Sequence, residues 1–246
     1  MARLEYKYYI PLEYLDSLRR ELLPFLMHDK FTNQRTVKEY TVRSIYLDTP
    51  DLLTYNQKLD GIKKRNKFRI RGYNEQTENS MVFLEIKRKY VDHISKDRAP
   101  ILYSNLESFI ESNDISLIMN SSDDTLQRQT YAGNFLYYFH FYNLRPRTLV
   151  VYEREAMECK FGSGLRVTFD KNIRVKSSNS YSDLYTNEKL IPATKNQFVL
   201  EIKFRKILPR WLPVIMKKYN IIRESVPKYA ISVDSSLNNI LAKFKN

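Results

Sequence analysis

Polar and apolar residues alternate along much of this chain, the pattern of strands that bury one face. The alternation predicts strands at residues 3–10, 40–48, 65–73, 81–90, 147–157, 165–175 and 197–206, with a further one near 181–186. The polar loop 74–80 predicts a hairpin between two of these strands, and Gly162-Ser163-Gly164 predicts another turn.

Between the strands, apolar residues recur every three or four positions, as they do on one face of a helix. This spacing predicts helices at residues 12–23, 124–143, 208–216 and 237–244. Strands outnumber helices and do not alternate with them regularly. The sequence therefore predicts an antiparallel α+β fold and a single domain over residues 1–246.

Composition limits the chemistry that this fold can carry. The chain has 246 residues, 43% of them hydrophobic, which is typical of a globular protein. Its one cysteine, Cys159, excludes an intramolecular disulfide and a thiolate zinc cluster. The charged N-terminal segment has no signal-peptide core, and the chain has no apolar run of about 18 residues. We expect a cytoplasmic protein without a membrane span of its own.

The net charge of the chain indicates its binding partners more than its fold. With 41 Lys+Arg against 28 Asp+Glu, the formal net charge is +13, which suits nucleic acid, an anionic membrane surface or a polyphosphorylated small molecule. The cations follow the strand alternation: Lys67, Arg69 and Arg71 share one face, opposite Phe68 and Ile70. One interpretation is a set of solvated strand faces.

A second interpretation requires the sheet to close on itself, which would turn these charged faces into a barrel lumen. A lumen lined with cations needs a compensating anion, so this arrangement predicts an elongated, strongly anionic ligand. Glutamates interspersed among the cations would balance charge or hold a divalent metal through their oxygens.

Seven segments carry a resemblance to a known family. In chain order they are Arg3-Leu-Glu-Tyr-Lys7, Lys67-Phe-Arg-Ile-Arg71, Leu84-Glu-Ile-Lys87, Ser95-Lys-Asp-Arg98, Tyr152-Glu-Arg154, Leu165-Arg-Val-Thr-Phe-Asp170 and Val199-Leu-Glu-Ile-Lys203. Together they resemble the VTC domain, the polyphosphate polymerase branch of the CYTH-like triphosphate tunnel metalloenzymes. The resemblance implies a closed antiparallel β-barrel, a tunnel of about eight strands with flanking helices.

The resemblance also implies a function and a site. Members that polymerise transfer the γ-phosphate of ATP to a growing polyphosphate chain and release ADP. The implied phosphate-binding residues are Lys7, Arg69, Arg71, Lys87, Lys96, Tyr152, Arg154, Arg166, Lys203 and Lys228. Among them, the implied catalytic residues are Arg69, Arg71, Arg154 and Lys228. Glu201 and Glu5 are the implied ligands of Mn²⁺ or Mg²⁺.

Other functions stay open from the sequence. A tunnel triphosphatase would hydrolyse tripolyphosphate or nucleoside triphosphates, and a non-catalytic module would only bind polyphosphate. Arg3 stands where the superfamily usually has a first glutamate. This difference weakens the interpretation as a hydrolase more than the interpretation as a polymerase. Specific nucleic-acid binding is not expected, because the cations are spread over separate strand faces. Any membrane function would need a separate membrane-protein partner.

Overall fold

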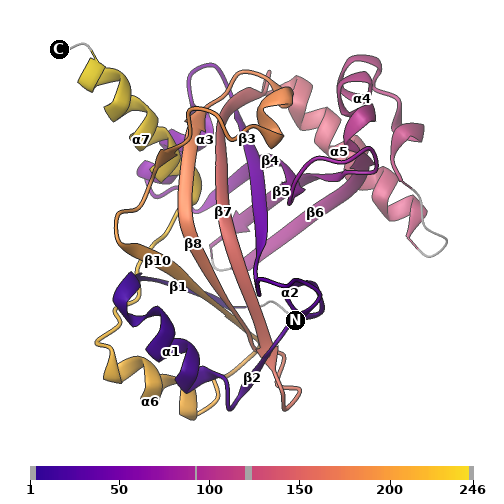
Figure 1. The fold of residues 1–246 in the computed structure, drawn as a ribbon. Coiled ribbons are helices and arrows are strands. Elements are labelled where there is room, and N and C mark those ends of the chain that lie inside the picture. Colours follow the sequence, from indigo (N-terminus) through magenta and orange to yellow (C-terminus); the bar gives the residue numbers. More distant parts are fainter. Residues whose placement is uncertain (1–3, 92, 120–123, 244–246) are drawn as a thin grey trace. The chain divides into compact units, whose positions relative to one another are not determined.

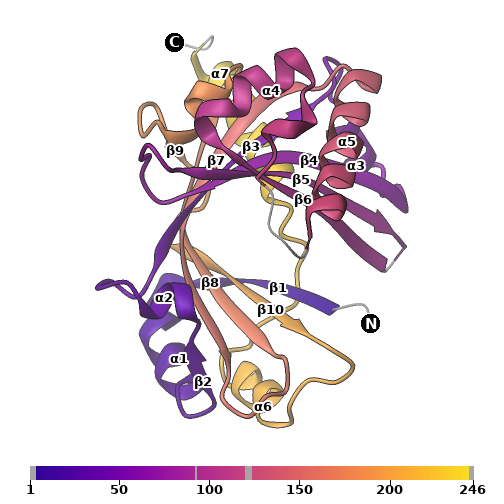
Figure 2. The same ribbon diagram turned by 90° about the vertical axis from the view of Figure 1, so that its right-hand side faces the viewer.

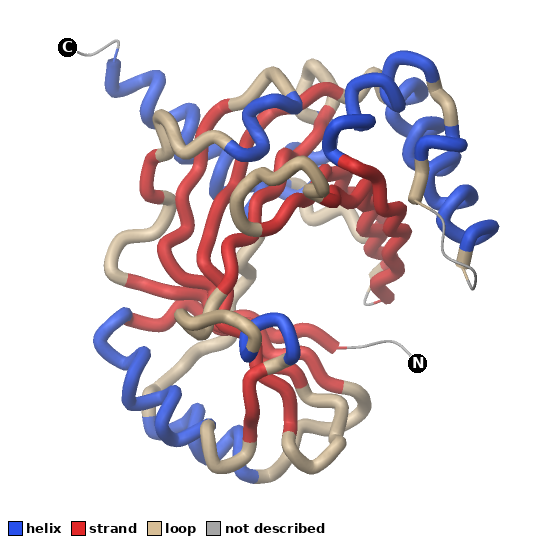
Figure 3. The backbone as a smooth tube through the Cα atoms, turned by 45° about the vertical axis from the view of Figure 1, so that its right-hand side comes forward, coloured by secondary structure: helices blue, strands red, loops and turns tan. Residues whose placement is uncertain are grey.

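The computed structural model describes residues 4–91, 93–119 and 124–243 (Figure 1). The strands are β1 (Leu4–Pro11), β2 (Leu26–His28), β3 (Tyr40–Asp48), β4 (Lys64–Tyr73), β5 (Met81–Tyr90), β6 (His93–Leu102), β7 (Arg145–Cys159), β8 (Arg166–Ser177), β9 (Ile191–Pro192) and β10 (Gln197–Phe204). The α-helices are α1 (Leu15–Leu22), α2 (Lys30–Asn33), α3 (Leu53–Leu59), α4 (Leu106–Ser112), α5 (Thr125–Phe141), α6 (Trp211–Lys218) and α7 (Lys228–Lys243). Figure 3 separates strands, helices and loops by colour.

The eight longer strands form one path in the order β1-β10-β8-β7-β3-β4-β5-β6, and the short β2 and β9 pair with β7 and β8. Pairing is antiparallel from β1 to β8 and from β3 to β6. An antiparallel sheet with flanking helices is therefore confirmed.

The closed barrel expected from the resemblance is wrong. Within the described residues, no strand pairing joins β1 to β6. Other segments already use part of each outer edge. The Glu224 N–H donates to the Lys7 carbonyl at 3.0 Å, and the Met119 N–H donates to the Pro100 carbonyl at 3.0 Å. An edge group that is bonded in this way is not available to a further strand.

The chain divides into two compact units. Unit 1 contains residues Met1–Thr41, Tyr152–Arg174 and Pro192–Pro227, and unit 2 contains Val42–Val151, Val175–Ile191 and Lys228–Asn246. Both units include strands of the same sheet, since the chain passes from one unit to the other within β3, β7, β8 and β9. Each unit has its own apolar core.

In unit 1 the core lies between α1, α6 and one face of the sheet. Leu18 and Leu22 of α1 and Leu212 of α6 pack with alternate residues of β1, β8 and β10, such as Phe169 and Leu200. Figure 1 shows α1 and α6 as neighbours, and Lys218 at the end of α6 pairs with Glu21 of α1. The intervening strand residues, which include the charged ones, therefore lie on the opposite face.

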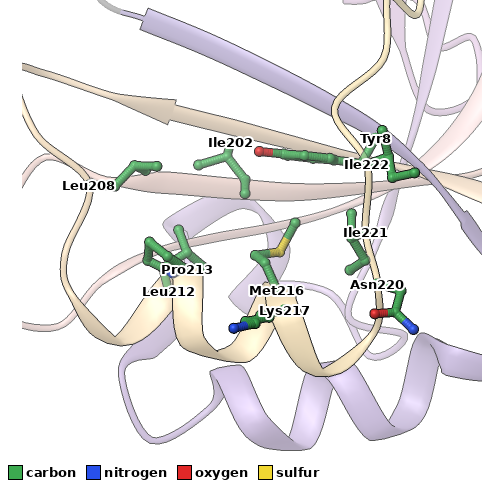
Figure 4. Close-up of a pocket in the computed structure, with 10 residues that line it drawn as sticks. All are labelled: Tyr8, Ile202, Leu208, Leu212, Pro213, Met216, Lys217, Asn220, Ile221 and Ile222. Carbon is green, nitrogen blue, oxygen red and sulfur yellow. The ribbon is translucent and has the colours of Figure 1, made fainter.

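An apolar pocket of about 500 Å³ lies beside α6 on the helix-covered side of unit 1 (Figure 4). Leu212, Pro213 and Met216 of α6 line it together with Tyr8 of β1 and Ile202 of β10. Tyr8 and Ile202 belong to the alternate positions that face the core of unit 1. The pocket is therefore on the other side of the strands from the charged residues.

Unit 2 repeats this arrangement with different elements. Helices α4 and α5 cover the face of β4, β5 and β6 that carries Phe68, Leu84 and Ile86 (Figure 2). Rings of α5, including Phe135, complete this core. One side of α5 therefore packs in the protein interior, whereas Tyr137 and Phe141 on the same helix are exposed.

The sequence predicted several of the longer elements well, but it predicted no strand at the position of β6. The expected strands 40–48 and 81–90 coincide with β3 and β5, and the Gly162-Ser163-Gly164 turn joins β7 to β8 with positive φ at both glycines. The helix expected at 237–244 begins earlier, at Lys228, and residue 244 lies outside the described residues.

The strand expected near 181–186 is wrong, because Tyr181–Tyr185 form a short 3-10 helix. The Ser180 side chain accepts a hydrogen bond from the Ser182 N–H and starts this turn. Leu184 and Tyr185 are both buried in the core of unit 2, so the apolar residues that suggested a strand belong to this turn.

No helix within the described residues is long and apolar enough to cross a membrane.

A buried carboxylate organises the start of α3 in unit 2. Asp48, which is fully buried, accepts hydrogen bonds from the N–H groups of Thr54 (2.9 Å) and Tyr55 (3.0 Å). It also accepts one from the Tyr229 hydroxyl at 2.5 Å, which ties the first turn of α7 to the same point. Burial and the nearby Asp48 raise the pKa of Tyr229, so its hydroxyl stays a donor.

We expect Asp48→Ala to lower the free energy of unfolding by about 3 kcal/mol, because the substitution leaves several buried donors without an acceptor. Chemical denaturation measures this loss. Asp60→Ala, at the exposed C-terminal end of α3, is the control and should change stability by less than about 0.5 kcal/mol. Equal effects of the two substitutions would contradict the assigned role of Asp48.

Candidate functional site

Alternating lysines and glutamates face one another across β1 and β10 in unit 1. The register places Lys7 opposite Glu201 and Glu5 opposite Lys203. The Lys7 ammonium lies 2.7 Å from Glu5 and 3.9 Å from Glu201. The Lys203 ammonium lies 2.6 Å from Glu201. Two carboxylates thus share two ammonium groups on the face away from the core.

Arg154 of β7 extends this cluster. Its guanidinium binds Asp170 of β8 through two hydrogen bonds of 2.6 and 2.8 Å, and its Nη2 lies 3.8 Å from Glu201. The ring of Tyr152 lies 5.2 Å from the same guanidinium. Burial alone would lower the pKa of Arg154, but Asp170 and the other acidic neighbours raise it well above its ordinary value. Arg154 is therefore a fixed positive charge.

Arg166 is placed differently from the other expected ligands. It lies opposite Lys203 in the β8–β10 register, but its guanidinium binds Asp29 at 2.6 Å. Asp29 is buried and also caps α2 by accepting from the Thr32 N–H at 2.8 Å. An incoming anion would have to compete with this carboxylate for Arg166.

Glu85 of β5 is the centre of the cluster in unit 2. Its carboxylate is 1% exposed and lies 2.6 Å from Arg69, 3.9 Å from Arg71, 3.3 Å from Lys96 and 3.4 Å from Arg98. Burial alone would raise the pKa of Glu85, but these four cations lower it far below its ordinary value. One carboxylate with four cations leaves a net positive site.

Tyr46 of β3 joins the same cluster. Its hydroxyl accepts a hydrogen bond from Arg69 at 3.3 Å, and its ring stacks on Tyr229 at 5.2 Å. Burial raises its pKa, but Arg69, Arg71 and Lys67 outweigh burial and lower the pKa to about 8. Lys228, the first residue of α7, directly precedes Tyr229 in the chain.

The expected site residues thus fall into two groups. Unit 1 holds Glu5, Lys7, Tyr152, Arg154, Arg166, Glu201 and Lys203, and unit 2 holds Arg69, Arg71, Lys87, Lys96 and Lys228. Lys87 and Lys96 lie opposite each other in the β5–β6 register. Arg3 lies outside the described residues.

The carboxylates of unit 1 bear on whether a divalent cation could bind there. Among the described residues, no three His, Cys, Asp or Glu side chains come together as a metal-binding group. Glu5 and Glu201 share the ammonium of Lys7 and supply carboxylate oxygens. Mg²⁺ is commonly held by one or two carboxylates together with the phosphates of a substrate. The residues present fit this mode of binding.

Sequence comparison identifies the family. A family model of the VTC domain matches residues 2–237, nearly the whole chain and parts of both units. The chain belongs to the VTC domain family.

The curated relatives of this VTC domain are much longer proteins. Vacuolar transporter chaperone complex subunit 4 of Trypanosoma cruzi (strain CL Brener) is 23% identical over 91% of the chain, and that of Trypanosoma brucei brucei (strain 927/4 GUTat10.1) is 22% identical over 91%. The chain spans 32% of the length of each.

Two solved structures are also similar. A proposed adenylyl cyclase, HpAC1, from Hippeastrum has a TM-score of 0.49 at 15% identity, covering 96% of this chain and 97% of its own. A proposed adenylate cyclase from Bacillus halodurans has a TM-score of 0.46 at 10% identity, covering 92% and 95%.

Several charged partners in this VTC domain were not among the residues expected from the sequence. Glu85, Arg98 and Asp170 stand within the motifs, yet their roles depend on contacts between strands. Tyr46 could have been suspected only from the alternation of β3, which places it on the same face as Ser44. The contact between Asp29 and Arg166 could not be predicted, because the two residues are 137 positions apart in the chain.

The titration of Tyr46 gives a first test of this site. Tyrosinate absorbance near 295 nm should rise with a midpoint near pH 8, and Tyr46→Phe should remove this component. Inorganic tripolyphosphate should raise the midpoint, because a bound anion offsets the field of the cations. Tyr137→Phe, an exposed position on α5, is the control. Identical titrations of Tyr46→Phe and the unsubstituted protein would contradict the assignment.

The lowered pKa of Glu85 predicts a pH-dependent stability. The ionised carboxylate stabilises the fold above its unfolded pKa, near 4.5, and this contribution is lost as pH falls through the lower folded pKa. At pH 7, Glu85→Gln should unfold more easily, by on the order of 3 kcal/mol, since it leaves buried cations uncompensated.

Thermal unfolding followed from pH 7 downward measures this difference, which should shrink below about pH 4.5. Glu78→Gln, in the exposed loop between β4 and β5, is the control. A difference that stays constant with pH would show that ionisation of Glu85 is not the cause.

Proposed function

We propose that this VTC domain is an ATP-dependent polyphosphate polymerase. In the proposed reaction, a terminal oxygen of a polyphosphate chain attacks the γ-phosphorus of ATP and the bond from that phosphorus to the β,γ-bridging oxygen breaks. ADP leaves with this oxygen, and the chain becomes one phosphate longer. Family membership and the excess of fixed cations over carboxylates support the proposal.

The observation that carries the proposal is the cluster at Glu85. Four cations surround this single buried carboxylate, so the site has a net positive charge before any ligand binds. Phosphoryl transfer depends mainly on positioning and charge neutralisation, for which such cations are suited. Guanidinium groups also match phosphate oxygens through paired hydrogen bonds. No Ser, Cys or His nucleophile is required.

The proposed roles follow the two groups of residues. Arg69, Arg71, Arg154 and Lys228 would contact the reacting phosphates, and the remaining lysines, Arg166 and Tyr152 would hold the rest of the chain. Glu201 and Glu5 would hold Mn²⁺ or Mg²⁺, which would neutralise charge on phosphate oxygens.

One feature favours transfer to a phosphate chain over hydrolysis. A hydrolase needs a group that orients or deprotonates water. In unit 1, the carboxylates nearest the cations already bind ammonium groups: Glu5 binds Lys7 and Glu201 binds Lys203. These carboxylate oxygens are therefore already engaged by cations and are less available to orient water. Tunnel triphosphatase activity is therefore the second candidate.

The curated relatives are named as subunits of a vacuolar transporter chaperone complex. By extension, we propose that any translocation of the product depends on a separate membrane-protein partner. The proposed location of the chain itself is the cytoplasm, where ATP is available.

The test is to incubate the purified chain with ATP and Mn²⁺ or Mg²⁺ and to quantify polyphosphate, ADP and orthophosphate. We expect polyphosphate, with one ADP per phosphate added. Arg69→Gln in unit 2 should lower kcat/KM by about 100-fold, because it removes a cation from the reacting phosphates. Lys7→Gln in unit 1 should mainly raise the KM for polyphosphate, because it removes a cation that holds the rest of the chain.

Lys217→Gln, an exposed lysine on α6, is the matched control and should leave turnover unchanged. Orthophosphate without polyphosphate would replace the polymerase with the triphosphatase. Tight polyphosphate binding without turnover would reduce the chain to a binding module.

A further inference from the structure

The charged face of β4, β5 and β6 in unit 2 continues beyond the Glu85 cluster in regular rows. We call Arg69, Glu85 and Arg98, which lie opposite one another, the central row. The next residues on this face, Lys67, Lys87 and Lys96, form the lysine row. Beyond it, Arg65 lies opposite Lys89, and we call this pair the outer row.

The carboxylates of these strands do not extend along the rows. Glu85 is in the central row, whereas Asp97 of β6 is on the opposite face and binds Arg88 and Asn134 there. The register therefore places three lysines opposite one another across three strands, and the ammonium of one of them, Lys96, reaches Glu85 at 3.3 Å. Like charges directly opposite in a sheet are destabilising. Such a cost is compensated when an anion binds the rows.

The rows have the dimensions of an extended ligand site. Successive rows are two strand residues apart, which corresponds to about 6.8 Å. From Arg71 to Arg65 the strand covers six residues, or about 20 Å. Arg65 and Lys89 are half-buried, and Arg65 donates one N–H to the Ile62 carbonyl at 2.7 Å. The guanidinium of Arg65 is thus held in place and keeps other donors for a ligand.

We propose that these rows form a continuous track for a linear polyphosphate chain, and that Arg65 and Lys89 are its outer subsite. This inference rests on the proposed function and adds a dependence on chain length. A short chain is held by the central and lysine rows. Only a longer chain reaches Arg65 and Lys89 as well.

The test compares the binding of inorganic tripolyphosphate and of long-chain polyphosphate at fixed ionic strength, by calorimetry with the full chain. The double variant Arg65→Gln/Lys89→Gln should weaken long-chain binding about fivefold or more and change tripolyphosphate binding less than twofold. The matched control is Lys64→Gln/Lys217→Gln, which removes the same charge from two exposed lysines outside the rows. Lys64 precedes Arg65 on β4 and points to the other face. This control should leave both affinities within twofold.

Each outcome has a separate meaning. If the unsubstituted chain binds neither phosphate, the proposed function fails and the track fails with it. If it binds both and the two double variants behave alike, the track is wrong while the proposed function stands. Equal weakening of the short and long chains by the Arg65/Lys89 variant, with unchanged thermal unfolding, would also overturn the outer subsite. Single-stranded DNA binding as tightly as the long chain would replace polyphosphate with nucleic acid as the ligand of the rows.

Discussion

Keeping several cations on one face of a folded sheet is the constraint on which this protein depends. Lysines and arginines repel each other and lose hydration when they are brought together, so a fold that collects them must also supply counter-charge. The two units do so in the same way. In unit 2, Glu85 is set among four cations, and in unit 1 Asp170 holds Arg154 while Glu201 holds Lys203. In unit 2 the counter-charge is smaller than the positive charge that it organises, whereas in unit 1 each of these cations has a carboxylate of its own.

The opposite faces of the strands provide the stability that such a site requires. Each unit covers the apolar face of its strands with helices: α1 and α6 in unit 1, and α4 and α5 in unit 2. Burial of apolar side chains contributes roughly 25 cal/mol per Å², which supports strands whose other face is costly in charge. Apolar and charged residues must therefore alternate strictly along β4 and β10. A shift of one residue in the strand register would put cations in the core.

This alternation also explains what the sequence could predict. It predicted β3 and β5 with correct bounds, and it placed Lys67, Arg69 and Arg71 on one face, because both facts follow from local period-two spacing. The strand β6 was missed because its buried face carries Asp97, whose polarity is satisfied by Arg88 and Asn134 from other elements. Asp29 and Tyr46 were missed for the same reason: their partners are distant in sequence, and only the strand order brings them together. The closed barrel was an inference from resemblance, and local spacing cannot show which groups occupy the outer edges of β1 and β6.

The rigidity of these clusters bears on the proposed chemistry. A cation that is held by a buried carboxylate before the ligand binds does not have to be ordered when phosphate arrives, so less free energy is lost in reorganisation. Arg154, fixed by two hydrogen bonds to Asp170, and Arg69, fixed by Glu85, are arranged in this way. Lys96 is held less tightly, at 3.3 Å from Glu85 with its side chain 44% exposed. A site that combines fixed guanidinium groups with more mobile ammonium groups suits a ligand whose repeating phosphates must bind firmly at one point and move past others.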